Sequence, residues 1–181
     1  MTIRTLVLSL GIALLTLLTF TPAGTAQTAP PASVNTAHQY TPYEKLVLQN
    51  VTQFHKNFNN RDWDKNGPLV AENLHVNSNG VEFTGRDAFV KRIARFAGPF
   101  PDVKIDDQVI VVDGNKAVIR FMITGTQKGD FQTRDGVIPA TNRPIKIDGM
   151  EFFTLDEQGK VVDLLTVEDI AGLLQQLKAK N

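Results

Sequence analysis

An alternation of apolar and polar residues runs through the segment 143–169 and predicts two paired strands. In its first half, one row holds apolar residues at 145, 147, 153 and 155, and the intervening residues form the opposite row. This period of two is typical of a β-strand. The polar turn at 156–160 and the apolar run at 161–167 predict a returning strand, so the segment is expected to be a hairpin.

Glu151 interrupts the apolar row of the first strand. A carboxylate facing a core must be protonated, paired with a cation or exposed to a water-filled cavity, because burying it charged and alone costs on the order of several kcal/mol. Our working hypothesis is the cavity, with Glu151 as its chemical centre. Asp148 alternates to the opposite face and is left out of the predicted site.

Periodicities elsewhere in the chain predict an α+β fold. Thr41, Pro42 and Glu44 form a typical helix start, and apolar spacing predicts an amphipathic helix to about Asn60. We expect short helices over 65–71 and 88–96, strands over 74–78, 103–112 and 117–126, a loop over 128–142, and a final helix over 170–178. Helices on one face of a curved antiparallel sheet would enclose an apolar, cone-shaped interior suited to a small molecule.

Several further residues are candidates for the site. His75 and Asn77 share one face if their strand is regular, although an exposed edge strand explains them as well. Asp169 is either a second polar group or the cap of the final helix, and capping is favoured. His55 lies beside the apolar seam of the first helix and is interpreted as a packing residue, because the sequence gives it no partner. The predicted pocket residues are His75, Asn77, Phe121, Phe153, Leu165 and Asp169.

The amino terminus has the pattern of a secretory signal peptide. A short positive start precedes fifteen apolar or small residues at 6–20, and small residues then lead to a cleavage site before Gln27. An uncleaved anchor is the alternative, although the run is short for a membrane span. We expect a signal peptide over 1–26, a flexible linker over 27–40 and a domain over 41–181. The mature protein is expected to be secreted or periplasmic, without stable membrane association.

Charge and cysteine content narrow the classes of function. The 19 basic and 19 acidic residues cancel, so nothing points to a nucleic-acid partner. The sequence has no cysteine, which excludes disulfides and thiol nucleophiles. The row opposite Glu151 contains Met150 and Phe152, and Met122 lies on the same outer face. This much apolar surface predicts a homodimer.

The order of short motifs resembles the SnoaL-like polyketide cyclase family of the NTF2-like superfamily. The motifs are NNRDWD at 59–64, GVEFTGRD at 80–87, FPD at 100–102 and GMEFFTLDEQGKVVDLLTVED at 149–169. The resemblance extends from about Tyr43 to Leu177. It implies an NTF2-like cone, with three helices on the concave face of the sheet and a short C-terminal helix. It also implies that the acid at position 151 is a general acid/base for ring-closing aldol chemistry, without metal or cofactor.

Three positions depart from the family pattern. Glu151 stands where aspartate is usual, Leu165 replaces a common tryptophan, and Gln127 occupies a position where many members carry histidine. We expect an apolar small-molecule pocket, with acid/base catalysis of the aldol cyclase or isomerase type centred on Glu151. The alternatives are a non-catalytic secreted protein that binds a hydrophobic ligand, and a dimerisation domain whose interior is filled by side chains.

Overall fold

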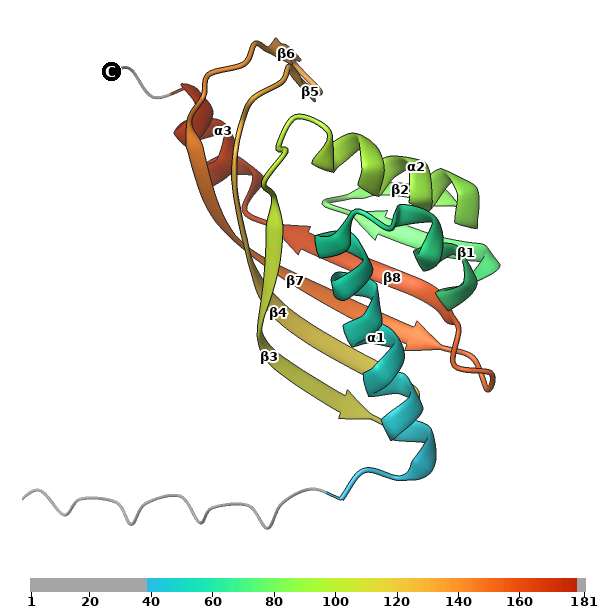
Figure 1. The fold of residues 1–181 in the computed structure, drawn as a ribbon. Helices are drawn as coiled ribbons and strands as arrows, with labels where there is room; N and C mark the ends of the chain where they lie inside the picture. The colour runs from blue at the N-terminus through green and yellow to red at the C-terminus, as the bar shows by residue number, and fades with distance from the viewer. Residues whose placement is uncertain (1–38, 179–181) are drawn as a thin grey trace, which may run out of the picture. The chain divides into compact units, whose positions relative to one another are not determined.

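The structure is a computed structural model that describes residues 39–178. The predicted signal peptide, nearly all of the predicted linker and the last three residues lie outside this range. The described elements are α1 (Pro42–Asn60), the 3-10 helix η1 (Trp63–Leu69), β1 (Val70–Ser78), β2 (Val81–Thr84), α2 (Arg86–Ala97), β3 (Lys104–Asp113), β4 (Lys116–Thr126), β5 (Phe131–Thr133), β6 (Gly136–Ile138), β7 (Pro144–Leu155), β8 (Val161–Glu168) and α3 (Ile170–Lys178) (Figure 1).

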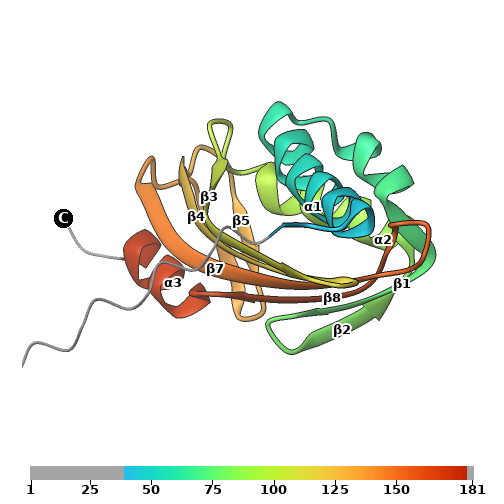
Figure 2. The ribbon, with the colours of Figure 1, turned by 90° about the horizontal axis from the view of Figure 1, so that it is seen from below.

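Six strands form one curved sheet in the order β2-β1-β8-β7-β4-β3, and β5 and β6 form a separate hairpin. All neighbours in the large sheet are antiparallel except β1 and β8, which run parallel. The predicted β7–β8 hairpin is confirmed and lies near the middle of the sheet. Helices α1 and α2 lie on the same side of the curved sheet (Figure 2). The expected α+β cone is therefore confirmed.

Helix α1 begins where the sequence predicts. The Thr41 hydroxyl accepts from the Glu44 backbone N–H at 3.2 Å, and the Glu44 carboxylate accepts from the Thr41 N–H at 2.8 Å. This reciprocal pair satisfies two backbone donors that the helix cannot satisfy itself. Further along, the Asn59 side chain makes two 2.8 Å hydrogen bonds with the Ile105 backbone and ties α1 to edge strand β3.

Gly149 leaves room for the Phe121 side chain near the centre of the inner face of the sheet. It pairs with Phe121 across β4 and β7. A Cβ added at Gly149 would lie 2.2 Å from Phe121 Cε2, which is far inside van der Waals contact. The absence of a side chain at position 149 therefore lets the aromatic ring lie across β7, on the face that carries Glu151.

Three segments differ from the sequence-based expectation. Residues 81–84, for which no strand was expected, form the edge strand β2. The short helix expected over 65–71 is the 3-10 helix η1, which starts at Trp63 and contains Pro68. The expected loop over 128–142 contains the β5–β6 hairpin. Gln127, which precedes this segment, is fully buried, and its side-chain amide donates to the carbonyls of Gly129, Ile138 and Pro139. Its role is to hold the segment together.

The outer face of the sheet carries a band of exposed apolar side chains. Its members come from β3, β7 and β8: Val109, Val111, Met150, Phe152, Leu165 and Val167. Within this face, Arg120 pairs with Asp148 at 2.5 Å. Among the helices of residues 39–178, none is long and apolar enough to cross a membrane.

Candidate functional site

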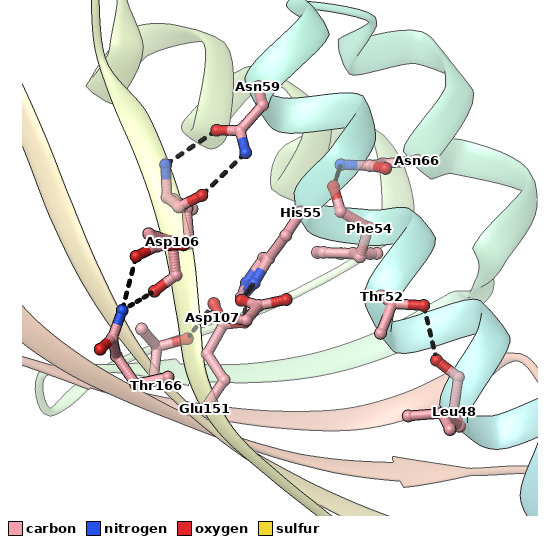
Figure 3. A network of polar contacts seen from close by, with 12 residues as sticks. Leu48, Thr52, Phe54, His55, Asn59, Asn66, Asp106, Asp107, Glu151 and Thr166 are labelled. Atoms are coloured by element: carbon pink, nitrogen blue, oxygen red, sulfur yellow. Dashed lines mark hydrogen bonds and ion pairs between the residues drawn. The ribbon is translucent and has the colours of Figure 1, made fainter.

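His55 of α1 connects two carboxylates that come from different strands. Its Nδ1 lies 2.5 Å from Asp107 Oδ1 of β3, and its Nε2 lies 3.0 Å from Glu151 Oε2 of β7. Figure 3 shows the imidazole reaching from the helix toward both acids. Glu151 is also within reach of the Thr166 hydroxyl, which donates to Oε1 at 3.3 Å. Side chains from α1, β3, β7 and β8 thus meet in one polar cluster.

The geometry requires His55 to be protonated when both acids are ionised. A carboxylate only accepts hydrogen bonds, so both ring nitrogens must donate, and only the imidazolium can do this. Burial by itself lowers the pKa of His55, but its hydrogen bonds to Asp107 and Glu151 and their negative charges outweigh burial and raise the pKa to about 9. His55 is therefore a cation at neutral pH.

The three side chains differ in their access to water. His55 is almost fully enclosed, with 4% of its side chain exposed, whereas Glu151 is 12% and Asp107 24% exposed. Water therefore reaches part of both acidic side chains but hardly reaches the imidazole between them. The sequence hypothesis placed Glu151 in a cavity. The structure pairs it with a cation, which is another of the three environments that the sequence left open.

Local sequence features fix the position of each member. The two hydrogen bonds between the Asn59 side chain and the Ile105 backbone hold β3 against α1. Ile105 lies two residues before Asp107 in the chain. The register of β3 on β4 shifts between Asp107 and Val109, which marks a bulge. Because bulges re-aim the residues around them, Asp107 points inward while Val109 points outward. Phe121 closes one side of the cluster, with its ring at 5.2 Å from the His55 ring in a T-shaped arrangement.

The structure separates the sequence-predicted site residues into two groups. Glu151, Phe121 and Phe153 share the inner face of the sheet; Phe121 contacts His55, and Phe153 is fully buried and packs against Phe54. His75, Asn77 and Leu165 do not join them. Their neighbours Leu74, Val76, Leu164 and Thr166 occupy the inner face, so strand alternation directs these three outward.

The outward residues have partners of their own. His75 Nδ1 lies 2.6 Å from Asp163 Oδ1, and Asn77 donates to Glu82 at 3.2 Å. Asp169 is exposed, and its carboxylate accepts from the Gly172 N–H at 2.8 Å. It therefore acts as the cap of α3, which was the favoured interpretation.

Sequence reasoning missed His55 and Asp107. His55 had no visible partner because its two acids follow 52 and 96 residues later. A signal for Asp107 exists in the sequence: the apolar row of its strand changes parity, from Val103 and Ile105 to Ile110 and Val112. Such a change predicts a bulge, and bulges are frequent beside active sites.

Glu151 lines neither of two surface depressions in the described part of the chain. One is lined by Tyr43, Asn115, Leu155, Asp156 and Glu157, and the other by residues of η1 and α2 with Lys160. Within residues 39–178, no group of three or more His, Asp or Glu side chains is arranged to hold a metal ion. The cluster at Glu151 can transfer protons and can accept hydrogen bonds from a ligand.

The domain has the architecture of an NTF2-like cone. It combines a curved sheet, helices on the concave face of that sheet and an acid on the inner face. The SnoaL-like polyketide cyclase family model matches residues 49–177. The chain therefore belongs to the SnoaL-like polyketide cyclase family. No curated protein matches it in sequence.

Solved structures with this fold include bacterial polyketide cyclase relatives. A protein from Jannaschia sp. CCS1, described as a SnoaL-like polyketide cyclase, has 17% identity and a TM-score of 0.69, over 80% of this chain and 99% of the other. TsrD from Streptomyces laurentii has 23% identity and a TM-score of 0.66, over 78% and 100%. IdmH from Streptomyces antibioticus, described as a polyketide cyclase, has 20% identity and a TM-score of 0.63, over 74% and 99%. At these identities the likeness establishes the fold.

Proposed function

We propose that this protein is an exported acid/base catalyst of the aldol cyclase or isomerase type, acting on a small apolar carbonyl compound. Glu151 is the group that takes a proton from the carbon next to the carbonyl and returns it later. The observation that carries the proposal is the pairing of Glu151 with His55 on the inner face, with 12% of the Glu151 side chain still exposed.

The cluster around Glu151 has a net negative charge. Two carboxylates and one imidazolium carry a net charge of −1, in a place where surrounding apolar side chains make an uncompensated charge costly. Accepting one proton from a substrate neutralises the cluster. His55 fixes the orientation of Glu151 through one ring nitrogen, and Asp107 holds the other ring nitrogen, so the imidazole cannot rotate away.

Family membership supports the reaction class, because the relatives with this fold include proteins described as polyketide cyclases. No metal or cofactor is required by the proposed step. The proton leaves carbon for Glu151, the electron pair of the C–H bond forms the enol or enolate, and the proton returns to carbon or remains until a new carbon–carbon bond has formed.

Exchange of carbon-bound hydrogen tests this proposal directly. 2-Tetralone, an apolar aromatic ketone, exchanges its C1 hydrogens for deuterium in D₂O when a base removes them. The wild-type protein is expected to accelerate this exchange, and Glu151→Gln is expected to abolish the acceleration. Glu157→Gln, at an exposed turn, is the matched control. Equal rates with and without wild-type protein would contradict the proposal.

Export is part of the proposal and rests on the pattern of residues 1–26. We expect the mature chain to begin at Gln27 when the full sequence is expressed in a bacterial host. The intact mass of protein from the periplasmic fraction tests this expectation. A mass that retains residues 1–26 would contradict it.

The proposed assembly is a homodimer that buries the outer face of the sheet. The exposed band consists of six apolar side chains from β3, β7 and β8. Single exposed apolar residues are normal on a protein surface, but a group of this size on one face is typical of an interface. Pairing of two copies through this band leaves the inner face, with Glu151, free in each copy.

A further inference from the structure

A second carboxyl group, that of Glu168, faces the same interior as Glu151. Glu168 ends strand β8, two residues beyond Thr166, which contacts Glu151. The register pairs Glu151 with Thr166 and Gly149 with Glu168. The two acids are therefore diagonal neighbours on one face, a relationship that places backbone positions about 7–8 Å apart.

The side chain of Glu168 is held in place by Asn79. Asn79 Nδ2 donates to Glu168 Oε2 at 3.0 Å, and Asn79 Oδ1 accepts from the Glu168 backbone N–H at 2.8 Å. Asn79 itself has a left-handed backbone with φ 51°, and its N–H donates to the Thr166 carbonyl at 2.9 Å. This clamp fixes both ends of Glu168 without using its second oxygen.

The second oxygen, Oε1, is the one available to a ligand. No donor within residues 39–178 lies on it. Every fully buried side-chain nitrogen or oxygen in this part of the chain has a hydrogen-bond partner, so Oε1 must keep contact with solvent. Arg92 of α2, which is exposed and donates to Ser78 Oγ at 3.0 Å, lies close enough for its charge to act on Glu168.

The surroundings of Glu168 raise the pKa of its carboxyl group. Burial raises the pKa of Glu168, the hydrogen bond from Asn79 opposes this effect, the charge of Glu151 raises the pKa further, and Arg92 lowers it. The groups that face Glu168 are thus Glu151 from β7, Arg92 from α2 and Asn79 from the β1–β2 turn. The net direction is upward, so Glu168 keeps its proton to a higher pH than an ordinary glutamic acid.

We propose that Glu168 is a second catalytic residue, which donates a hydrogen bond from its carboxyl group to the carbonyl oxygen of the substrate whose adjacent carbon loses a proton to Glu151. This inference rests on the proposed function and specifies its substrate class. The substrate is an enolisable ketone or β-keto compound, small enough to place its oxygen on Glu168 and its acidic carbon on Glu151.

The step is balanced within the two acids and the substrate. Glu151 takes the proton from carbon, and the C–H electron pair becomes the new C=C bond. The former carbonyl π electrons move to oxygen, where Glu168 supplies the hydrogen bond or the proton. Return of a proton to carbon regenerates Glu151, and the enol oxygen returns any proton it received to Glu168. No oxidant or reductant takes part.

The experiment compares Glu168→Met, Glu168→Gln, Glu151→Gln and the Glu157→Gln control in the 2-tetralone exchange assay. Methionine at 168 has about the length of glutamate but no hydrogen to donate, whereas glutamine keeps the contact with Asn79 and an N–H donor but cannot ionise. In Glu168→Met we expect exchange to fall by about 10²–10³-fold, the usual loss when a donor to a developing oxyanion is removed. In the wild type, the rate should also fall at high pH as Glu168 ionises, and this limb should disappear in Glu168→Gln.

Binding of 2-naphthol, a stable planar analogue of the 2-tetralone enol, supplies a readout that does not depend on turnover. We expect 2-naphthol to move the carboxyl ¹³C NMR signal of Glu168, which is assigned by its absence in Glu168→Gln. If exchange is lost only in Glu151→Gln, while Glu168→Met retains the wild-type rate and Glu168→Gln retains the wild-type pH profile, Glu168 has no catalytic role, but the proposed function stands. If the wild type neither exchanges 2-tetralone nor binds 2-naphthol, both proposals are wrong.

Discussion

The imidazole Nε2 of His55 lies 3.0 Å from Glu151 Oε2, although the two residues are 96 positions apart in the chain. This contact turns an acid in an apolar row into one half of an ion pair. It depends on α1 crossing the concave face of the sheet, and on Asp107 holding the other side of the ring. The stability and the chemistry of the domain are therefore coupled through one histidine.

Replacing His55 tests that coupling first. His55→Gln removes the cation and leaves Asp107 and Glu151 facing each other with little solvent between them. Breaking a buried ion pair by removing one partner typically costs about 3–5 kcal/mol, and we expect a loss near the lower value because both acids retain some exposure. Urea unfolding at pH 7 measures it. His75→Gln, on the outer face, is the control, and an equal effect of the two variants would contradict the structural role of His55.

The pH dependence of stability follows from the raised pKa of His55. The folded pKa is about 9 and the reference value is 6.5. The imidazolium therefore contributes fully to stability below pH 6.5, and the contribution is lost as pH rises through about 9. We expect the stability difference between the wild type and His55→Gln to shrink across this window. Unfolding curves at a series of pH values measure it, and a difference that stays constant would show that His55 does not titrate there.

The sequence predicted the β7–β8 hairpin, the α1 start and the inward position of Glu151 because each depends on local alternation or capping. The partner of Glu151 was not predictable in the same way. His55 meets its acids only after a sheet has formed, and Asp107 turns inward because of a bulge. His75, Asn77 and Leu165 point outward because β1 and β8 present Val76 and Leu164 to the core, a choice that the short predicted strand at 74–78 left open.

A methyl group at Gly149 is expected to disturb the wall of the site. Gly149→Ala forces the Phe121 ring, which contacts His55, to shift, and such overpacking typically costs about 1–3 kcal/mol. Thermal unfolding measures the loss, with Met150→Ala on the opposite face as control. Combining Gly149→Ala with Phe121→Leu should cost less than the two changes added together. Simple additivity would show that the two residues do not interact.

Gln127 is expected to stabilise only the segment that contains β5 and β6. Gln127→Ala removes the donor to three carbonyls of the segment that contains β5 and β6. We expect amide hydrogen exchange to accelerate within residues 129–141, with little change in β7 and β8. Gln132→Ala, at an exposed position in the same segment, is the control. Uniform acceleration across the domain would mean that Gln127 supports the whole core.

A substitution on the outer face of the sheet tests the proposed homodimer. Leu165→Glu places a charge in the exposed apolar band, directly opposite Phe152 of β7, and we expect sedimentation velocity to show the mass of one chain where the wild type shows two. Val137→Glu changes an exposed residue of β6, outside this band, and should leave the mass unchanged. A wild type that sediments as a single chain at high concentration would contradict the proposal.

The rate of deuterium incorporation at C1 of 2-tetralone, compared between wild type and Glu151→Gln, tests the central claim most directly. Positioned general bases contribute about 10²–10⁴-fold, so the variant should lose that much and approach the rate in buffer. Circular dichroism of the variant should show that the fold is retained. A folded Glu151→Gln variant that exchanges 2-tetralone as fast as the wild type would show that Glu151 does not transfer the proton.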